Sequence, residues 1–580
     1  MLKKIAIVLI VVLSGLVAAK VLNLPIPFMK SDDKKSDLSI LNYVPQNSAL
    51  YFSGDIELMH AAMQMSNIDT IIDSAKNEIG YMSSEDEQIV DSAFGFIKAL
   101  FTEDGAVQYG IATQGEMAVY FNGLFPVLKI AVADEAILNG KLSALFAQVD
   151  AVKIEDKDLS GQMVKQINIE DEVTITYQVS ADYFTLTVSP YAVEQSVLDN
   201  IFNPEGVLDS VITSESYKAD QTKYGFNDSF KMILNIKEIA SAMVDPSTSV
   251  LGQQLAKYIP ESQQALAVVQ SEECKEDVMS IASAVPRIIA GYTKLNITDT
   301  NIDSESSVVL EIMNPEVLSI LKMIVGHISS NALTQDAILS VGVGIDVSQL
   351  LPAYTKMSEL IQNTEFKCMP LAMGKMFLPE APAQLAMASQ MAGSVKGVSA
   401  SIIDVDVDFS QGMPQLKSFD AIVAVSTNDA AALAMMAAAN PVVTFDSLDS
   451  NGAASKLNSM FLPPEVELFA AIKGNFLTVY SGEAGEKAAN ELSTESLDSN
   501  SLLSFALNFG KILAKEELIK NAMMMAGPDI CTDPSVREAI DMVASNKGSE
   551  ALQLEINDFG IVFSGQSNML KSDLAFNICP

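Results

Sequence analysis

Six short patterns of apolar and polar residues occur twice in this chain, in the same order. They are a strand running into a helix, a strand ending in a polar turn, a hairpin, another strand entering a helix, a cysteine before a helix, and an alternating strand. The paired segments are 48–58 with 337–350, 126–134 with 419–429, 173–188 with 466–480, 229–239 with 504–513, 274–281 with 531–540, and 295–299 with 552–557. Short apolar runs recur by chance, so the shared order carries the argument. We interpret it as an ancestral duplication, with the boundary between Val325 and Asp336.

Each copy alternates hairpins with helices, which is typical of an α+β fold. The alternation of apolar and polar residues over 173–188 and 466–480 indicates half-buried antiparallel strands. We therefore predict two tandem, diverged α+β copies, each with antiparallel sheet hairpins packed by helices. The predicted organisation is a signal peptide or membrane anchor at 1–28, a linker at 29–42, a first copy at 43–328 and a second copy at 329–580.

The N-terminus predicts export. Lys3 and Lys4 precede an apolar run over 5–19, which Lys20 ends. Such a run is near the upper limit for a signal-peptide core and short for a membrane span, but a helix over 5–24 spans if Lys20 snorkels. A retained anchor in the inner membrane is slightly favoured over a cleaved signal. Both interpretations place the body on the periplasmic side of the inner membrane of a bacterium.

A segment after the predicted linker carries a family resemblance. Tyr43-Val-Pro-Gln-Asn-Ser-Ala-Leu-Tyr-Phe52 resembles the Tyr-Val-Pro-Ala-Asp-Thr opening of an uncharacterised family of exported or membrane-anchored bacterial proteins, a domain of unknown function. Gln46, Asn47 and Ser48 stand where that family usually has Ala-Asp-Thr, and the sharp part of the match covers about ten residues. The resemblance implies an envelope location and supplies no catalytic residues to transfer.

The charge balance excludes one class of partner. The chain has 36 Lys and Arg against 73 Asp and Glu, for a formal net charge of −37. Because a protein with this negative charge repels the phosphate backbones of nucleic acids, we expect no nucleic-acid partner. Hydrophobic residues make up 49% of the chain, which argues against disorder in spite of the charge. The acidic residues are spread along both copies, and we interpret them as a solvated coat.

The four cysteines permit two disulfides in an exported chain. Sequential pairing needs no interleaving, so we favour Cys274 with Cys368 and Cys531 with Cys579. Buried free thiols are the alternative.

Two clusters are candidates for metal ligands. Met59, His60 and Met63 would lie together on a helix, and thioether and imidazole ligands suit Cu(I). The alternative is that these methionines belong to the helix core. Asp404, Asp406 and Asp408 would share one face of a strand, about 6.8 Å apart, which is too far for adjacent pairs to hold one divalent ion without further ligands. We interpret them mainly as a solvated face.

The motifs of common catalytic classes are absent from the sequence. It contains no Gly-x-Ser-x-Gly, no His-Glu-x-x-His and no Gly-rich phosphate loop, and only two histidines, His60 and His327. We therefore predict a non-catalytic cell-envelope protein that binds or scaffolds another envelope component, with no cofactor. One alternative is a carrier or sensor of an apolar ligand. A second alternative is a hydrolase with a carboxylate site.

Overall fold

The computed structural model divides the chain into two compact units, Met1–Glu311 and Ile312–Pro580. The predicted copies divide at 328/329, while the structure divides after Glu311, where a long hairpin ends. The structure describes residues 39–64, 72, 91, 94–100, 102–147, 154–169, 173–260, 266–297, 301–376, 383–408, 415–438, 443–444, 448, 452–459, 466–515, 520 and 548–570. The predicted anchor at 5–24 lies outside these residues, and no helix within them is long and apolar enough to cross a membrane.

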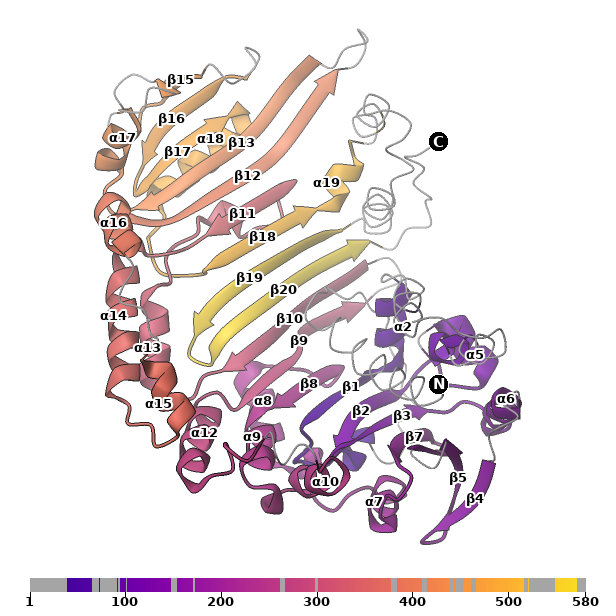
Figure 1. The fold of residues 1–580 in the computed structure, drawn as a ribbon. Helices are drawn as coiled ribbons and strands as arrows, with labels where there is room; N and C mark the ends of the chain where they lie inside the picture. The colour runs from indigo at the N-terminus through magenta and orange to yellow at the C-terminus, as the bar shows by residue number, and fades with distance from the viewer. Residues whose placement is uncertain are drawn as a thin grey trace. The chain divides into compact units, whose positions relative to one another are not determined.

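The first unit is built on an antiparallel sheet whose strands run β4-β5-β6-β7-β3-β2-β1-β8-β9-β10 (Figure 1). These strands are β1 Leu50–Asp55, β2 Glu116–Asn122, β3 Phe125–Ala131, β4 Ile154–Leu159, β5 Gln162–Ile169, β6 Val173–Val179, β7 Tyr183–Pro190, β8 Phe230–Asn235, β9 Arg287–Ile297 and β10 Asn301–Glu311. The helices are η1 Ile40–Tyr43, α2 Ile56–Gln64, α5 Glu103–Tyr109, α6 Glu135–Ala147, α7 Gln195–Ile201, η2 Val211–Thr213, α8 Glu215–Tyr224, α9 Ile236–Val244, η3 Pro246–Thr248, α10 Val250–Tyr258 and α12 Glu272–Ala284.

The second unit repeats this strand order. Its antiparallel sheet runs β14-β15-β16-β17-β13-β12-β11-β18-β19-β20, so each strand takes the place of the strand numbered ten lower. The strands are β11 Leu339–Val343, β12 Val395–Asp408, β13 Gln415–Thr427, β14 Val443–Thr444, β15 Ser455–Ser459, β16 Leu468–Lys473, β17 Phe476–Ser481, β18 Leu503–Asn508, β19 Ser549–Asn557 and β20 Gly560–Leu570. The helices are α13 Pro315–Met323, η4 Ser330–Ala332, α14 Val347–Asn363, α15 Met369–Lys375, α16 Ala383–Ala392, α17 Ala430–Ala438, α18 Gly482–Glu491, η5 Leu492–Thr494 and α19 Phe509–Leu513. Helices and antiparallel sheet together confirm the α+β class.

Helices cover both faces of the sheet in the first unit. Short helix η1 and helix α8 lie over the face that carries Ser53, and enclose a pocket there. On the opposite face, α6 and the helical residues 94–100 pack against Leu128 and Leu186. In the second unit, α18 packs on one face, where Phe476 and Ala489 are fully buried. Helix α17 covers part of the other face.

Helix starts follow local sequence rules at matching places in both units. The Asn235 side chain accepts a hydrogen bond from the Glu238 N–H (3.1 Å) at the start of α9, and Asn508 accepts one from the Lys511 N–H (2.9 Å) at the start of α19. Each asparagine thereby satisfies one of the N–H groups that a helix start leaves unpaired. The residue that ends the strand therefore also fixes the first turn of the helix.

Replacing Asn235 by alanine is expected to lower the free energy of unfolding by about 1 kcal/mol, because the Glu238 N–H loses its acceptor. Urea unfolding of the full chain, followed by circular dichroism, measures the change. Asn235→Ser is the control, because serine also caps well and should restore most of the lost stability. Equal stabilities of the alanine and serine variants would contradict the capping role.

Candidate binding sites

One face of the sheet in the second unit exposes a continuous set of large apolar side chains. Cross-strand register places them on the same side of β11, β12, β13, β18, β19 and β20. Their exposed fractions run from 41% for Phe505 to 56% for Phe563. We call this surface the open face; it comprises Val341, Val343, Val398, Val423, Leu503, Phe505, Leu552 and Phe563. Contiguous apolar surface of this kind marks interaction sites in proteins.

A groove of about 300 Å³ lies at one side of the open face. Side chains of β11, β12, β13, β16 and β17 line it, and their exposed atoms in the groove are almost all carbon. The lining includes Leu339, Val341, Ala400, Val423, Leu468 and Val479. Such a lining offers apolar contact without polar groups that would orient a small polar ligand.

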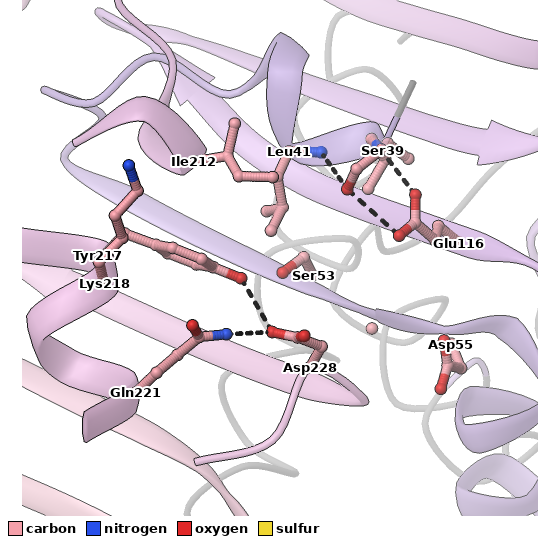
Figure 2. Close-up of a pocket in the computed structure, with 12 residues that line it drawn as sticks. Ser39, Leu41, Ser53, Asp55, Glu116, Ile212, Tyr217, Lys218, Gln221 and Asp228 are labelled. Atoms are coloured by element: carbon pink, nitrogen blue, oxygen red, sulfur yellow. Dashed lines mark hydrogen bonds between the residues drawn. The ribbon is translucent and has the colours of Figure 1, made fainter. Parts of the chain in front are cut away.

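The first unit holds a pocket of different character, about 350 Å³ in volume (Figure 2). Figure 2 shows Ser53 between two hydrogen-bonded groups. On one side, Tyr217 Oη donates to Asp228 Oδ1 (3.2 Å), which also accepts from the Gln221 amide. On the other side, Glu116 accepts from the Ser39 hydroxyl (3.2 Å) and from the Ile40 N–H (2.7 Å). These bonds hold both carboxylates in place, so the pocket is polar and preformed.

Two buried lysines lie beneath this face of the first unit. Lys129 on β3 and Lys231 on β8 stand on one cross-strand row with Ala118 and Ser53. The Lys231 Nζ lies 3.7 Å from the centre of the Tyr217 ring and has no hydrogen-bond partner among the described residues. Burial lowers the pKa of Lys231, although nearby Asp220 and Asp228 partly oppose this.

Lys129 is the more perturbed of the two lysines. Its Nζ donates to Thr185 Oγ1 (2.8 Å) and lies 3.9 Å from the centre of the Tyr43 ring. Burial lowers the pKa of Lys129 to about 7. The same row in the second unit carries Ala424 and Ser504 in place of the two lysines. Buried amines therefore stand on this row in the first unit but not in the second.

Arg287, Asp220 and Glu311 form a buried ion network in the first unit. The Arg287 guanidinium donates twice to Asp220 (2.9 Å each) and twice to Glu311 (2.6 and 3.0 Å). Burial alone would raise the pKa of Glu311, but hydrogen bonds from Arg287 and Tyr224 lower it to about 2. The Arg287 guanidinium therefore donates these hydrogen bonds to carboxylates within the protein.

Both histidines make hydrogen bonds within the protein. His60 is buried on α2, and its Nε2 donates to the Leu100 carbonyl (3.1 Å). His327 contacts the Asp498 carbonyl through Nδ1 (2.7 Å) and Glu495 through Nε2 (2.8 Å). Although burial opposes it, the hydrogen bond with Glu495 raises the pKa of His327. The His327 ring thus links its own segment to residues 495–498 of the second unit.

The candidate copper ligands lie in the core of the first unit as far as the structure describes them. Met59 is buried beside His60 on α2, and the side chain of Met63 lies outside the described residues. Among the described residues, no group of three or more His, Cys, Asp or Glu side chains could hold a metal ion.

The acidic strand segment contacts lysines at two of its three carboxylates. Asp404 pairs with Lys515 (2.9 Å) and Asp408 with Lys417 (3.5 Å), while Asp406 is exposed on the same strand, β12. Although burial opposes it, the hydrogen bond from Lys515 lowers the pKa of Asp404.

The predicted disulfide residues are described in part. Cys274 and Cys368 are both buried and disulfide-bonded, as predicted for these two residues. Cys531 and Cys579 lie outside the described residues, and their pairing stays a prediction.

The sequence interpretation missed the open face, its groove, the polar pocket and the two buried lysines. A signal for the lysines was present, because Lys129 and Lys231 each interrupt an apolar strand. The open face had no such signal, since exposed and buried valines look alike in a sequence.

The chain was compared with family models, curated proteins and solved structures. No family model matches it, and no curated protein or solved structure matches it either. The resemblance at Tyr43–Phe52 therefore remains a prediction, and function is argued from the sites alone.

Proposed function

We propose that this chain is an exported, non-catalytic envelope protein that binds another envelope component through the open face of its second unit. The observation that carries the proposal is the exposure of large apolar side chains on neighbouring strands of one sheet. Leaving these side chains in water costs free energy, at roughly 25 cal/mol per Å² of apolar surface. A partner that covers them recovers that free energy, which is the usual reason for such a patch.

The net charge of the chain limits the classes of partner that can bind. A net charge of −37 disfavours direct docking on anionic lipid headgroups or nucleic acid. A protein, or an uncharged apolar molecule, carries no such penalty. We favour a protein partner, because the open face spans six strands, while a small ligand is usually enclosed on most of its surface.

A carrier of an apolar ligand is the second candidate function. The groove of about 300 Å³ with its apolar lining favours it, because this volume is at the lower end of the range of small-molecule sites. The groove forms part of the open face, so both candidate functions use the same surface.

The cellular setting remains a proposal from the sequence. The basic, apolar N-terminus supports residues 5–24 as an anchor in the inner membrane, with the two units on the periplasmic side. The shared strand order of the two units supports the proposed tandem duplication. Under this proposal, the second copy has become the binding copy.

A photo-crosslinking side chain at position 505 is expected to trap a discrete protein partner in intact cells, because Phe505 lies within the open face. The same group at position 208 is the control, since Leu208 is 95% exposed in the first unit. Adding Val341→Lys should reduce the yield at position 505 by about tenfold, because a charge is introduced into the apolar contact. The adducts are identified by mass spectrometry.

Equal crosslinking from positions 505 and 208, or no effect of Val341→Lys, would contradict the proposed function. An adduct of lipid mass at position 505, without a protein adduct, would select the carrier instead. Circular dichroism of each variant shows that the exposed substitutions leave the fold intact.

A further inference from the structure

The groove of the second unit occupies a position that the first unit fills with side chains of its own helices. The β6–β7 and β16–β17 hairpins both close with two-residue turns, at 181–182 and 474–475. Residues of the two hairpins correspond when they lie the same number of residues from these turns. Their cross-strand partners on β3 and β13 then correspond as well, which gives four corresponding sheet residues in each unit. They are Leu128, Ile175, Leu186 and Val188 in the first unit, and Val423, Leu468, Val479 and Ser481 in the second. All four residues of the second unit line the groove, and all four of the first line a cavity of only about 60 Å³.

Two helical segments of the first unit, residues 94–100 and α6, reduce the cavity volume there. Phe96, Ile97 and Leu100 come from the first of these segments, line the small cavity and are at most 7% exposed. The Phe96 ring lies 6.0 Å from the ring of Phe184 on β7 in an edge-to-face arrangement. Together with Leu142, Leu145 and Phe146 of α6, these side chains cover the apolar sheet face in the first unit.

The second unit places the corresponding part of its chain elsewhere. Residues 94–100 belong to the connection between β1 and β2, and the matching connection between β11 and β12 forms α14, α15 and α16. Figure 1 shows these three helices beside one end of the strands of this unit. They supply none of the described residues that line the groove. The second unit has the same apolar floor, and the described residues of this connection supply no helix that covers it.

We propose that the groove receives an amphipathic helix from another protein, which presents large apolar side chains with the spacing of Phe96, Ile97 and Leu100. This spacing places all three side chains on one face of a helix. The inference rests on the proposed function and names the kind of partner that the open face binds. The acidic chain favours a partner helix whose opposite face is basic.

A labelled peptide based on residues 91–103 of this chain tests the inference. Alanine replaces Gly95 in the peptide to strengthen the helix, because a Cβ at Gly95 meets no atom within 4 Å. Fluorescence anisotropy with the full chain is expected to give saturable binding. A control peptide with serine at positions 96, 97 and 100 should bind at least about tenfold more weakly, because the apolar anchors are lost.

Protein variants locate the binding. Val423→Glu, in the floor of the groove, is expected to weaken the peptide by about tenfold or more. Val398→Glu is the matched control, because Val398 is similarly exposed on the open face but does not line the groove, and it should change the affinity less than about twofold. Absence of saturable binding, equal binding of the two peptides, or equal effects of the two variants would overturn the inference.

The crosslinking and peptide-binding experiments together distinguish failure of the proposed function from failure of the helix-binding inference. Partner trapping at position 505 without peptide binding would leave the proposed function standing and reject a helix as the occupant. Loss of both results would reject the open face as a binding surface. A groove already filled by another part of this chain would also give no peptide binding, and would overturn the inference.

Discussion

Replacing Arg287 by methionine is expected to lower the free energy of unfolding by about 3–5 kcal/mol, the largest effect of any substitution considered for this chain. Asp220 and Glu311 are each 2% exposed, and both receive two hydrogen bonds from the same guanidinium. Methionine fills a similar volume but leaves two neighbouring carboxylates buried without their shared cation. Uncompensated buried charge is among the most costly defects in a protein.

Urea unfolding at neutral pH measures this change. Lys165→Met is the control, because Lys165 pairs with Asp156 at the surface (2.9 Å), and exposed pairs contribute about 0–1 kcal/mol. Similar losses from the two variants would show that the Arg287 network is no more important than a surface pair. A triple variant that also removes Asp220 and Glu311 should recover much of the stability, because apolar replacements of buried ionic groups are often tolerated.

Replacing Lys129 by methionine is expected to remove a pH dependence of stability above pH 7. The pKa of this lysine is about 7 in the folded protein and about 10.5 in the unfolded chain. Between these values the unfolded chain holds a proton that the folded protein has lost, so the stability of the wild type rises with pH. One group contributes at most about 1.4 kcal/mol per pH unit.

The measurement compares unfolding free energies of the wild type and Lys129→Met between pH 7 and pH 9, below the range where tyrosines titrate. The slope of the variant should be smaller by nearly one proton. Lys165→Met, which removes one positive charge from the surface pair with Asp156, is the control for the loss of a charge. An unchanged slope in Lys129→Met would mean that Lys129 stays charged when buried.

Local rules predicted the elements that depend on nearby residues. The predicted hairpin over 173–188 forms β6 and β7, and the predicted hairpin over 466–480 forms β16 and β17. Asp346 caps the start of α14, since its side chain accepts a hydrogen bond from the Ser348 N–H (3.1 Å). Each of these features is encoded within a few residues, by period-two alternation or by a capping side chain.

The sites depend on residues far apart in the sequence. Lys129 and Lys231 share a row only because β3, β2, β1 and β8 are neighbours in that order. Arg287 meets Asp220 and Glu311 through the placement of α8 beside the ends of β9 and β10. These contacts depend on strand order and register, and neither property can be derived from a single segment of the sequence.

The sequence by itself determined the α+β class, the positions of the hairpins and the acidic, apolar-rich character of both halves. Periodicity and composition are local properties, so they can be found without a structure. Only the tertiary structure decided which apolar faces are covered. Val423 and Leu128 stand at matching places in similar strands, yet helices bury Leu128 while Val423 is 42% exposed. The physical reason is that burial depends on where a long connection packs, and the side chains of a strand do not specify that.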